Sequence, residues 1–450
     1  MAKRRHKKTI AGNAKRRKEN ASTTTSTALM PVGSLMSDDM AIEVLLRLPP
    51  KAVTRFRCVS PAWRDLISSN GFKQQYHDAA AVAAAAANAV PRFVFVPADP
   101  ESNERRCDTP SWCSIVKAYP PHSPGVATAG KPCLGVFLLG MPSDGLFFLC
   151  NPSTGGLLSL PPRRPACYIH SASLGYHAVT GEHKVLLLEH AEGQLVSAPN
   201  LQGHVLTVGA RRRSWRAPRG KRSAAIRDVV VPTGTDPVFA DGCLHFMLSP
   251  KYWLRDEPQG ILSFSLGSES FSRIPPPPFA AADAVKYSKD HLKPDPDAAE
   301  DSQEVKAPAG TTLAELDGSL CMVRDRRTDA MDTLEVWKLH AGSAGSWSLD
   351  YTIDLVSDLL KLPRVVVPLC YIMDDGETRK ILLATTLRKA HLYDPSTKKL
   401  HTVASNAKGA PMFPVFYQDS IVSMAGMEYG TAYYALSRLA VASPVIADVD

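Results

Sequence analysis

The chain has 450 residues, 44% of them hydrophobic, and a formal net charge of +8. This apolar content excludes global disorder, and the length favours a small domain joined to a large one. No stretch reaches the roughly 20 consecutive apolar residues that span a bilayer, and the basic N-terminus lacks the apolar segment of a secretory signal. The nine cysteines are scattered without a Cys-x-x-Cys pair, which favours free thiols over disulfides or zinc. We therefore expect a soluble intracellular protein.

The net charge is confined to the first 20 residues. Nine basic side chains and one acid lie there, whereas the remaining 430 residues hold equal numbers of acidic and basic groups. The basic side chains are Lys3, Arg4, Arg5, Lys7, Lys8, Lys15, Arg16, Arg17 and Lys18. Their two clusters resemble a bipartite nuclear localisation signal. A nonspecific solvated arm, or an arm that contacts nucleic-acid phosphates, is the alternative. We expect residues 1–35 to be disordered, because they offer almost nothing to bury.

Residues 36–77 have the pattern of a compact module of three short helices. Ser37 is a good N-cap for the first helix, and the prolines at 49 and 50 end that helix. A second short helix follows, and a third begins near Ser60. The apolar content is large for about 40 residues, which indicates that a partner covers some of these side chains. Ordinary helix core is the alternative explanation for apolar residues at this spacing.

The same residues closely resemble the F-box of plant F-box proteins. The resemblance is carried by residues 48–51 (Leu-Pro-Pro-Lys), 55–60 (Arg-Phe-Arg-Cys-Val-Ser) and 63–67 (Trp-Arg-Asp-Leu-Ile), with unbroken spacing between them. The family usually begins this domain with Leu-Pro, where this chain has Met36-Ser37. The resemblance implies docking onto a Skp-type adaptor, and the departure at Met36 implies a somewhat lower affinity for it.

The side chains expected to contact the adaptor are the large apolar and aromatic ones of this module, since such groups usually carry most of the binding energy of an interface. They are Met36, Ile42, Val44, Leu45, Leu48, Pro49, Val53, Phe56, Val59, Trp63 and Leu66.

Residues 78–91 form an alanine-rich linker that ends at a proline. Because alanine is the best helix former, this stretch predicts a helical spacer. A low-complexity linker is the alternative.

Residues 92–440 are predicted to form a large all-β domain. Short apolar runs alternate there with turn residues, as in antiparallel sheets. The clearest runs are 93–96, 135–139, 146–150, 184–188, 204–208, 243–248, 261–266, 319–323, 334–339, 380–384 and 390–393. Asp-Gly recurs before an apolar strand at 144–145, 241–242 and 317–318. Repeated units of this kind favour a β-propeller, with a β-sandwich as the alternative.

This second half resembles the F-box-associated β domain of plant F-box proteins. The resemblance is carried by the turn at 151–155 (Asn-Pro-Ser-Thr-Gly), the motifs at 173–176 and 180–185, and the segments 238–242, 261–264 and 335–339, with Trp347, Tyr351 and Asp354. One insertion, residues 275–308, is rich in proline, alanine and acidic groups. We expect it to be a flexible surface loop, either a lineage insertion or a regulatory segment.

Two patterns imitate catalytic or metal sites. Gly125 to Lys131 follows the spacing of a phosphate-binding loop, but Pro132 stands where a Ser or Thr would bind the metal. The histidines at 170, 177, 183 and 190 have no clustered cysteines beside them, so surface or satisfied histidines are expected rather than a metal site. No nucleophile or metalloprotease motif is present. We therefore expect no enzyme activity, no cofactor and no metal.

The resemblance as a whole implies a substrate-recruiting subunit of a Skp–cullin–F-box ubiquitin ligase in the nucleus, the cytoplasm or both. Its expected partners are the adaptor, a cullin reached through the adaptor, and a target protein held by the β domain. The alternative is a non-catalytic nuclear scaffold, or a chromatin-associated propeller that uses its basic arm. Membrane and nucleic-acid partners are not expected.

Overall fold

The computed structural model describes residues 38–85, 93–97, 127–128, 131–141, 145–163, 169–190, 201–209, 214–220, 226, 229, 231, 237–249, 259–291, 311–327, 333–340, 342, 345–354, 366–374, 378–385, 389–405, 412–429 and 440–442. The chain divides into two compact units, Met1–Leu45 and Leu46–Asp450. Within the described ranges, no helix combines the length and apolar character needed to cross a membrane.

The first described residues are helical. They form α1 (Asp38–Leu46), α2 (Pro50–Phe56), α3 (Pro61–Ser68) and α4 (Asn70–Ala85). The three predicted short helices are present, and Pro50 stands at the start of α2, where its missing N–H costs nothing. Helix α4 runs without a break into the alanine-rich stretch as far as Ala85. The helix predicted for that stretch is therefore confirmed to residue 85, and residues 86–90 lie outside the described part of the chain.

The strands form six antiparallel sheets among the described residues. In three of these sheets, four strands that are consecutive in the chain lie side by side in sequence order. These are β9 (Val238–Ala240), β10 (Cys243–Met247), β11 (Ile261–Ser265) and β12 (Phe271–Ile274); β13 (Thr311–Leu316), β14 (Ser319–Asp325), β15 (Thr333–Leu339) and β16 (Trp347–Asp354); and β17 (Val366–Asp374), β18 (Thr378–Thr385), β19 (Lys389–Asp394) and β20 (Lys399–Ser405).

The other three sheets lie earlier in the chain or join its two ends. The first of these has β2 (Ala127–Thr128), β3 (Phe137–Met141), β4 (Leu146–Asn151) and β5 (Gly156–Ser159), with the late strand β22 (Glu428–Tyr429) on its edge. The second has β6 (Ile169–His177), β7 (Glu182–His190) and β8 (Leu201–Thr207). The third, which we call the closing sheet, places β1 (Phe93–Pro97) between β21 (Met412–Phe416) and β23 (Ala440–Ala442).

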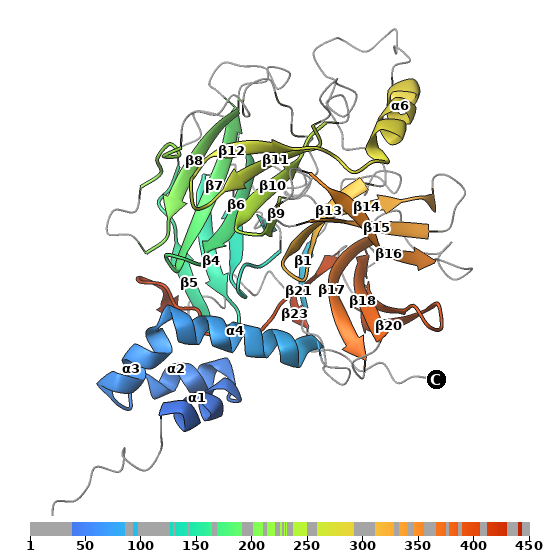
Figure 1. Ribbon diagram of the computed structural model, residues 1–450. Helices are drawn as coiled ribbons and strands as arrows, with labels where there is room; N and C mark the ends of the chain where they lie inside the picture. The colour runs from blue at the N-terminus through green and yellow to red at the C-terminus, as the bar shows by residue number, and fades with distance from the viewer. Residues whose placement is uncertain are drawn as a thin grey trace, which may run out of the picture. The chain divides into compact units, whose positions relative to one another are not determined.

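The sheets succeed one another in chain order around a common centre (Figure 1). Five clusters of buried apolar side chains lie between neighbouring sheets. One of them joins Phe93 of β1 and Phe416 of β21 with Phe137 of β3 and Leu382 of β18, so the closing sheet packs against both the first and the last of the other sheets. The ring is therefore closed by strands from both ends of the β region. The predicted β-propeller is confirmed, and the β-sandwich alternative is excluded.

Two of the three recurrent Asp-Gly pairs lie in two-residue hairpin turns. Asp241 and Asp317 have φ of 48° and 49°, and the glycines that follow have φ of 71° and 76°. A turn with positive φ at both central residues matches the twist of the flanking strands, and Asp-Gly is a favoured sequence for it. The repeated motif of the sequence is thus the turn between the first two strands of two successive sheets. Gly145, of the third pair, directly precedes β4.

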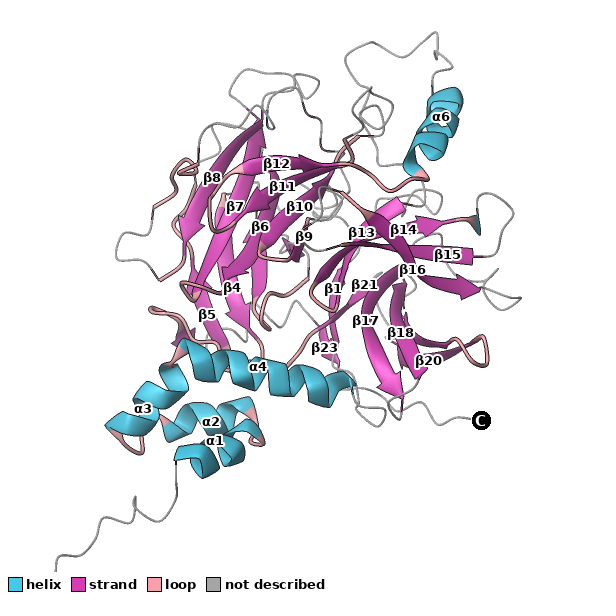
Figure 2. Cartoon of the chain, in the orientation of Figure 1, coloured by secondary structure: helices cyan, strands magenta, loops and turns pink. Residues whose placement is uncertain are grey.

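The insertion at 275–308 differs from the flexible loop that its composition predicts. Residues 280–291 form helix α6 (Ala280–His291) (Figures 1 and 2), while residues 292–308 lie outside the described ranges. Phe279, Ala280 and Ala284 are buried against the sheet of β13–β16 and its neighbour. Arg324 on β14 pairs with Asp283 in the first turn of α6, at 2.5 Å between Nη2 and Oδ1. The alanines supply helix propensity, and this packing and ion pair supply the stability that composition alone does not show.

Candidate functional site

Helix α1 exposes two apolar side chains on one side. Met40 is 57% exposed and Val44 is 48% exposed, and residues four apart lie on the same side of a helix. Leu45 and Ala41 on the same helix are buried. Helix α1 therefore buries one side and leaves two large apolar side chains exposed on another.

Each of the helices α2 to α4 buries apolar or aromatic side chains. Val53, Ile67, Phe72 and Tyr76 are buried, and the Tyr76 hydroxyl donates to the backbone oxygen of Leu48 at 2.6 Å. This hydrogen bond ties α4 to the connection between α1 and α2.

Two local features position α3. The Ser60 hydroxyl accepts from the backbone N–H of Trp63 at 3.2 Å, which caps the helix that the sequence predicts to begin near this residue. The rings of Phe56 and Trp63 then lie 5.3 Å apart between centroids. Beside them Val59, in the α2–α3 turn, is 62% exposed. The three side chains are brought together by the turn, and all three belong to the predicted docking set.

The eleven predicted docking residues fall into separate classes. Val44, Pro49 and Val59 are exposed, and Ile42, Leu48, Phe56, Trp63 and Leu66 are half-buried. Leu45 and Val53 are fully buried within the chain, so in this conformation they support the module from inside rather than offering surface to a partner. Met36 lies outside the described residues. Adaptor contact by this set stays a prediction, and the exposed members are the ones on which it can be tested most directly.

The segment with phosphate-loop spacing does not present its lysine to a ligand. Lys131 Nζ donates to the carboxylate of Glu315 on β13 and to the backbone oxygen of Leu369 on β17, the latter at 3.0 Å. Burial opposes the charge of this ammonium, but the Glu315 carboxylate outweighs it and raises the pKa of Lys131. Lys131 therefore ties strands β13 and β17 of the propeller together.

The histidines are part of the β structure. His183 on β7 is 5% exposed, with its ring 5.0 Å from that of Tyr176, and burial lowers its pKa to about 4. His177 Nδ1 lies 2.8 Å from the Thr180 hydroxyl. The side chains of His170 and His190 lie outside the described ones. Nowhere in the described ranges do three or more His, Cys, Asp or Glu side chains gather in a way that could hold a metal ion.

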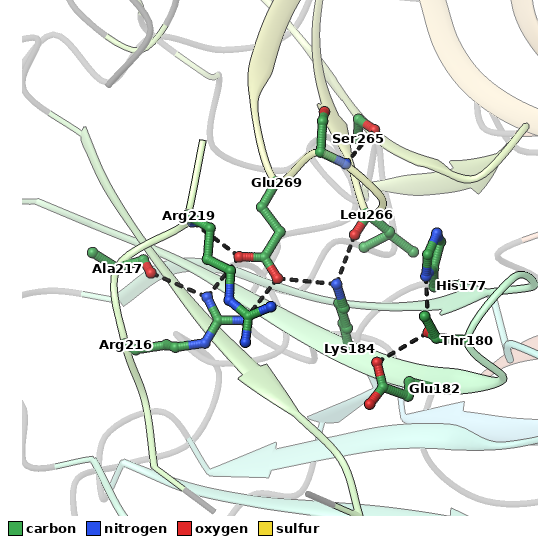
Figure 3. Close-up of polar contacts among 11 residues, drawn as sticks. His177, Thr180, Glu182, Lys184, Arg216, Ala217, Arg219, Ser265, Leu266 and Glu269 are labelled. Carbon is green, nitrogen blue, oxygen red and sulfur yellow. Dashed lines mark hydrogen bonds and ion pairs between the residues drawn. The ribbon is translucent and has the colours of Figure 1, made fainter. Parts of the chain in front are cut away.

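A buried carboxylate organises one junction between sheets (Figure 3). Glu269, in the turn between β11 and β12, is 2% exposed. It accepts from Lys184 of β7 at 2.9 Å, from both terminal nitrogens of Arg216 at 2.6 and 2.7 Å, and from the backbone N–H of Arg219 at 2.9 Å. Burial alone raises the pKa of a carboxyl, but these hydrogen bonds outweigh it and lower the pKa of Glu269 to about 2.

Sequence reasoning did not single out this junction. Lys184 and Glu269 are 85 residues apart, and no local pattern pairs them. One signal was present for Arg216: residues 211–222 contain seven basic side chains and no acid. The balanced total for the last 430 residues conceals this local excess.

Comparison with known proteins identifies two domains in the chain. An F-box domain matches residues 34–75, and an F-box associated beta propeller domain matches residues 92–403. A putative F-box protein of Arabidopsis thaliana is 28% identical over 191 residues, which is 41% of this chain and 46% of the relative. F-box only protein 8 of the same plant is 36% identical over 76 residues, or 17% of this chain and 20% of the relative. The matched part spans less than half the length of each of these relatives.

Among solved structures, virginiamycin B lyase from Staphylococcus aureus aligns with 66% of this chain and 82% of its own, at 8% identity and a TM-score of 0.32. Likeness at this level says nothing about chemistry.

The two domain matches and the fold agree. A small helical domain is followed by a propeller of the F-box associated type, and this pairing defines a class of proteins that are generally non-enzymatic. The chain belongs to this family of plant F-box proteins.

Proposed function

We propose that this protein is the substrate receptor of a Skp–cullin–F-box ubiquitin ligase, with the F-box bound to a Skp-type adaptor and a target protein held by the propeller. The observation that carries the proposal is the order of the two domains: an F-box at 34–75 directly precedes a propeller at 92–403. F-box domains generally bind Skp-type adaptors.

The exposed apolar side chains of the F-box support adaptor docking. Met40 and Val44 on α1, and Val59 in the α2–α3 turn, are each about half exposed or more. Burying such side chains stabilises a complex by roughly 25 cal/mol for each Å² of apolar surface removed from water.

Catalysis of ubiquitin transfer would come from other subunits, and this chain would contribute proximity. Tethering a target beside a conjugating enzyme raises the target's effective concentration there and holds the reacting groups in a productive orientation. A rigid propeller suits this role, because its closed ring of sheets gives the loops a fixed frame.

We also propose that the basic residues of segment 1–20 direct the complex to the nucleus. A nuclear scaffold that uses this arm on nucleic acid is the competing function, and salt-sensitive nucleic-acid binding that disappears with residues 1–20 would favour it. Changed localisation with unchanged adaptor binding would favour the receptor.

The docking proposal is tested by co-purification of the Skp-type adaptor with full-length variants. Val44→Asp and Val59→Asp each place a charge on an exposed apolar site, where the fold tolerates it but a dry interface does not. Val82→Asp is the matched control, because Val82 on α4 is 74% exposed and lies outside the predicted docking set. We expect adaptor recovery to fall at least tenfold for the first two, about 1.4 kcal/mol or more, and to stay unchanged for the control.

Leu48 and Pro49, both members of the predicted docking set, give a second, independent test. Their joint replacement by Ala removes apolar surface without adding charge, and should abolish adaptor recovery while the propeller stays folded. Full adaptor recovery by this double variant and by both aspartate variants would overturn the docking assignment.

A further inference from the structure

One stretch of the propeller is far more basic than the rest of it. Residues 211–222 hold seven basic groups and no acid, inside a body of 430 residues whose charges balance. A local excess of this kind creates a positive potential that a neutral total does not reveal. Only residues 214–220 of the stretch belong to the described part of the chain, and the structural argument rests on those residues.

The chain at 214–220 is held in place by three separate contacts. Trp215 Nε1 donates to the backbone oxygen of Pro161 at 2.9 Å, and the Trp215 ring packs on Phe147 at 6.1 Å. Arg216 exchanges two backbone hydrogen bonds with Val205 of β8, at 2.7 and 3.1 Å. Gly220 N–H donates to the backbone oxygen of Glu269 at 3.3 Å. This segment, which we call the basic turn, is therefore a fixed part of the β framework.

The two arginines of the basic turn differ in their side-chain contacts. Arg216 is paired with Glu269 and lies near the carboxylate of Glu182, which contributes to raising its pKa after the Glu269 hydrogen bonds. Arg219 gives Glu269 only its backbone N–H, and its side chain is exposed. Within the described residues, no ion pair or hydrogen bond engages the Arg219 guanidinium. Figure 3 shows Arg219 beside the carboxylate that fixes its backbone.

We propose that Arg219 is a contact for an acidic segment of the target protein, meaning one rich in Asp and Glu or in phosphorylated side chains. This rests on the proposed receptor function and names the chemistry of its target. A guanidinium is a planar fork that matches the geometry of carboxylate and phosphate groups, and because the fork is rigid, arginine loses less entropy for each hydrogen bond formed than lysine does. Nucleic acid is the less suited partner, because its binding spreads over many phosphate contacts along a groove, whereas the described framework fixes one free arginine here.

The test uses the full chain with the nine basic residues of segment 1–20 changed to Gln, so that the tail does not bind the probes. The probes are fluorescein-labelled peptides of equal length, one of glutamates and one carrying phosphoserines, and a single-stranded oligothymidine of similar charge. Binding is followed by fluorescence anisotropy at about 0.1 M salt, where charges within about 10 Å still interact. Arg219→Glu is compared with Lys399→Glu, an equal charge change at another exposed site of the propeller.

We expect Arg219→Glu to weaken binding of at least one peptide by roughly fivefold or more, and Lys399→Glu to weaken it less than about twofold. A larger effect on the glutamate peptide would indicate carboxylate recognition, and a larger effect on the phosphoserine peptide would indicate phosphate recognition. Arg219→Ala serves as a second variant, and unchanged melting temperatures verify that both variants fold. Equal effects of the two charge reversals, no effect of either, or a larger effect on the oligothymidine than on the peptides would overturn the proposal.

Adaptor co-purification from the same preparations separates this inference from the receptor function. Arg219→Glu should retain the adaptor fully. If the unmodified chain fails to bind the adaptor while the Arg219 effect on peptides persists, the ligase proposal falls and the acidic-segment contact stands.

Discussion

Lys184 of β7 and Glu269 of the β11–β12 turn form a buried ion pair, 2.9 Å between Nζ and Oε1, with side chains only 7% and 2% exposed. The same ammonium also donates to the backbone oxygen of Leu266 at 2.7 Å. The pair joins two neighbouring sheets of the propeller and, through Arg216 and Arg219, fixes the basic turn. Removing the pair should therefore lower the stability of the propeller and weaken target binding.

Glu269→Gln should destabilise the propeller by roughly 3 kcal/mol, because it leaves the buried Lys184 and the Arg216 guanidinium without their counter-charge. Urea unfolding of the full chain measures the change. Asp354→Asn is the control: it removes an ion pair with Lys398 that is largely solvent-exposed, and such pairs contribute little. A loss no larger than that of the control would contradict a stabilising role for this junction.

Stability should fall as the solution is acidified below about pH 6.5. Burial lowers the pKa of His183, and likewise of His245, from 6.5 to about 4. Between these values the unfolded chain binds more protons than the folded one, so the free energy of unfolding decreases as the pH falls. Each of the two imidazole rings contributes at most about 3 kcal/mol to the free energy of unfolding. This contribution is present in full above pH 6.5 and is lost by about pH 4.

Unfolding in urea between about pH 7.5 and 5 measures this dependence, above the range near pH 4.5 to 2 in which Glu269 gains its proton. His245→Gln should reduce the slope, while His401→Gln, at an exposed site, should not. A free energy of unfolding that is constant across this range would contradict the prediction.

Residues beyond the matched propeller segment should be essential for the ring. Strand β1 pairs with β21 from Phe93↔Phe416 to Pro97↔Met412, and with β23 from Phe93↔Ala442 to Phe95↔Ala440. A chain ending at residue 405 leaves β1 without either partner and exposes its edge and its apolar side chains. We expect this truncation to aggregate or to lose its cooperative thermal transition, as judged by size-exclusion chromatography and melting.

Removal of residues 443–450 alone is the matched truncation and should preserve the elution volume and the cooperative transition of the full chain. If the chain ending at 405 behaves in the same way, the closing sheet is dispensable.

Gly318 and Gly135 both have a left-handed backbone, but only at Gly135 would an added Cβ clash with neighbouring atoms. Gly318 has φ +76°, and a Cβ added there would have nothing within 4 Å. At Gly135, with φ +72°, a Cβ would lie 2.5 Å from Ser420 Cβ and 2.7 Å from the backbone oxygen of Gln418. Gly318→Ala should therefore cost about 1 kcal/mol for the left-handed backbone alone. Gly135→Ala should cost roughly 1–3 kcal/mol more. Thermal or urea unfolding compares them, and equal losses would contradict the close approach at Gly135.

Much of the fold could be predicted from the sequence, because its information is local. The Pro49–Pro50 stop, the Asp-Gly turns at 241–242 and 317–318 and the apolar strand runs each depend on neighbouring residues, and the structure has them at the predicted positions. The F-box could be recognised for the same reason. The helical part of the insertion could not, since the packing of Phe279 and the Arg324–Asp283 pair that stabilise α6 come from strands far along the chain.

The candidate docking site, too, could be predicted only in part from the sequence. Residue types and spacing selected eleven docking residues, but only the tertiary structure separates the exposed Val44 and Val59 from the buried Leu45 and Val53, because exposure depends on what packs above each residue. The same holds for charge. The sequence by itself determined that the net +8 belongs to a short tail and that the rest balances. Only the folded chain decided that Arg216 is neutralised by Glu269 while the Arg219 side chain remains exposed, since pairing depends on which side chains the ring of sheets brings within a few ångströms.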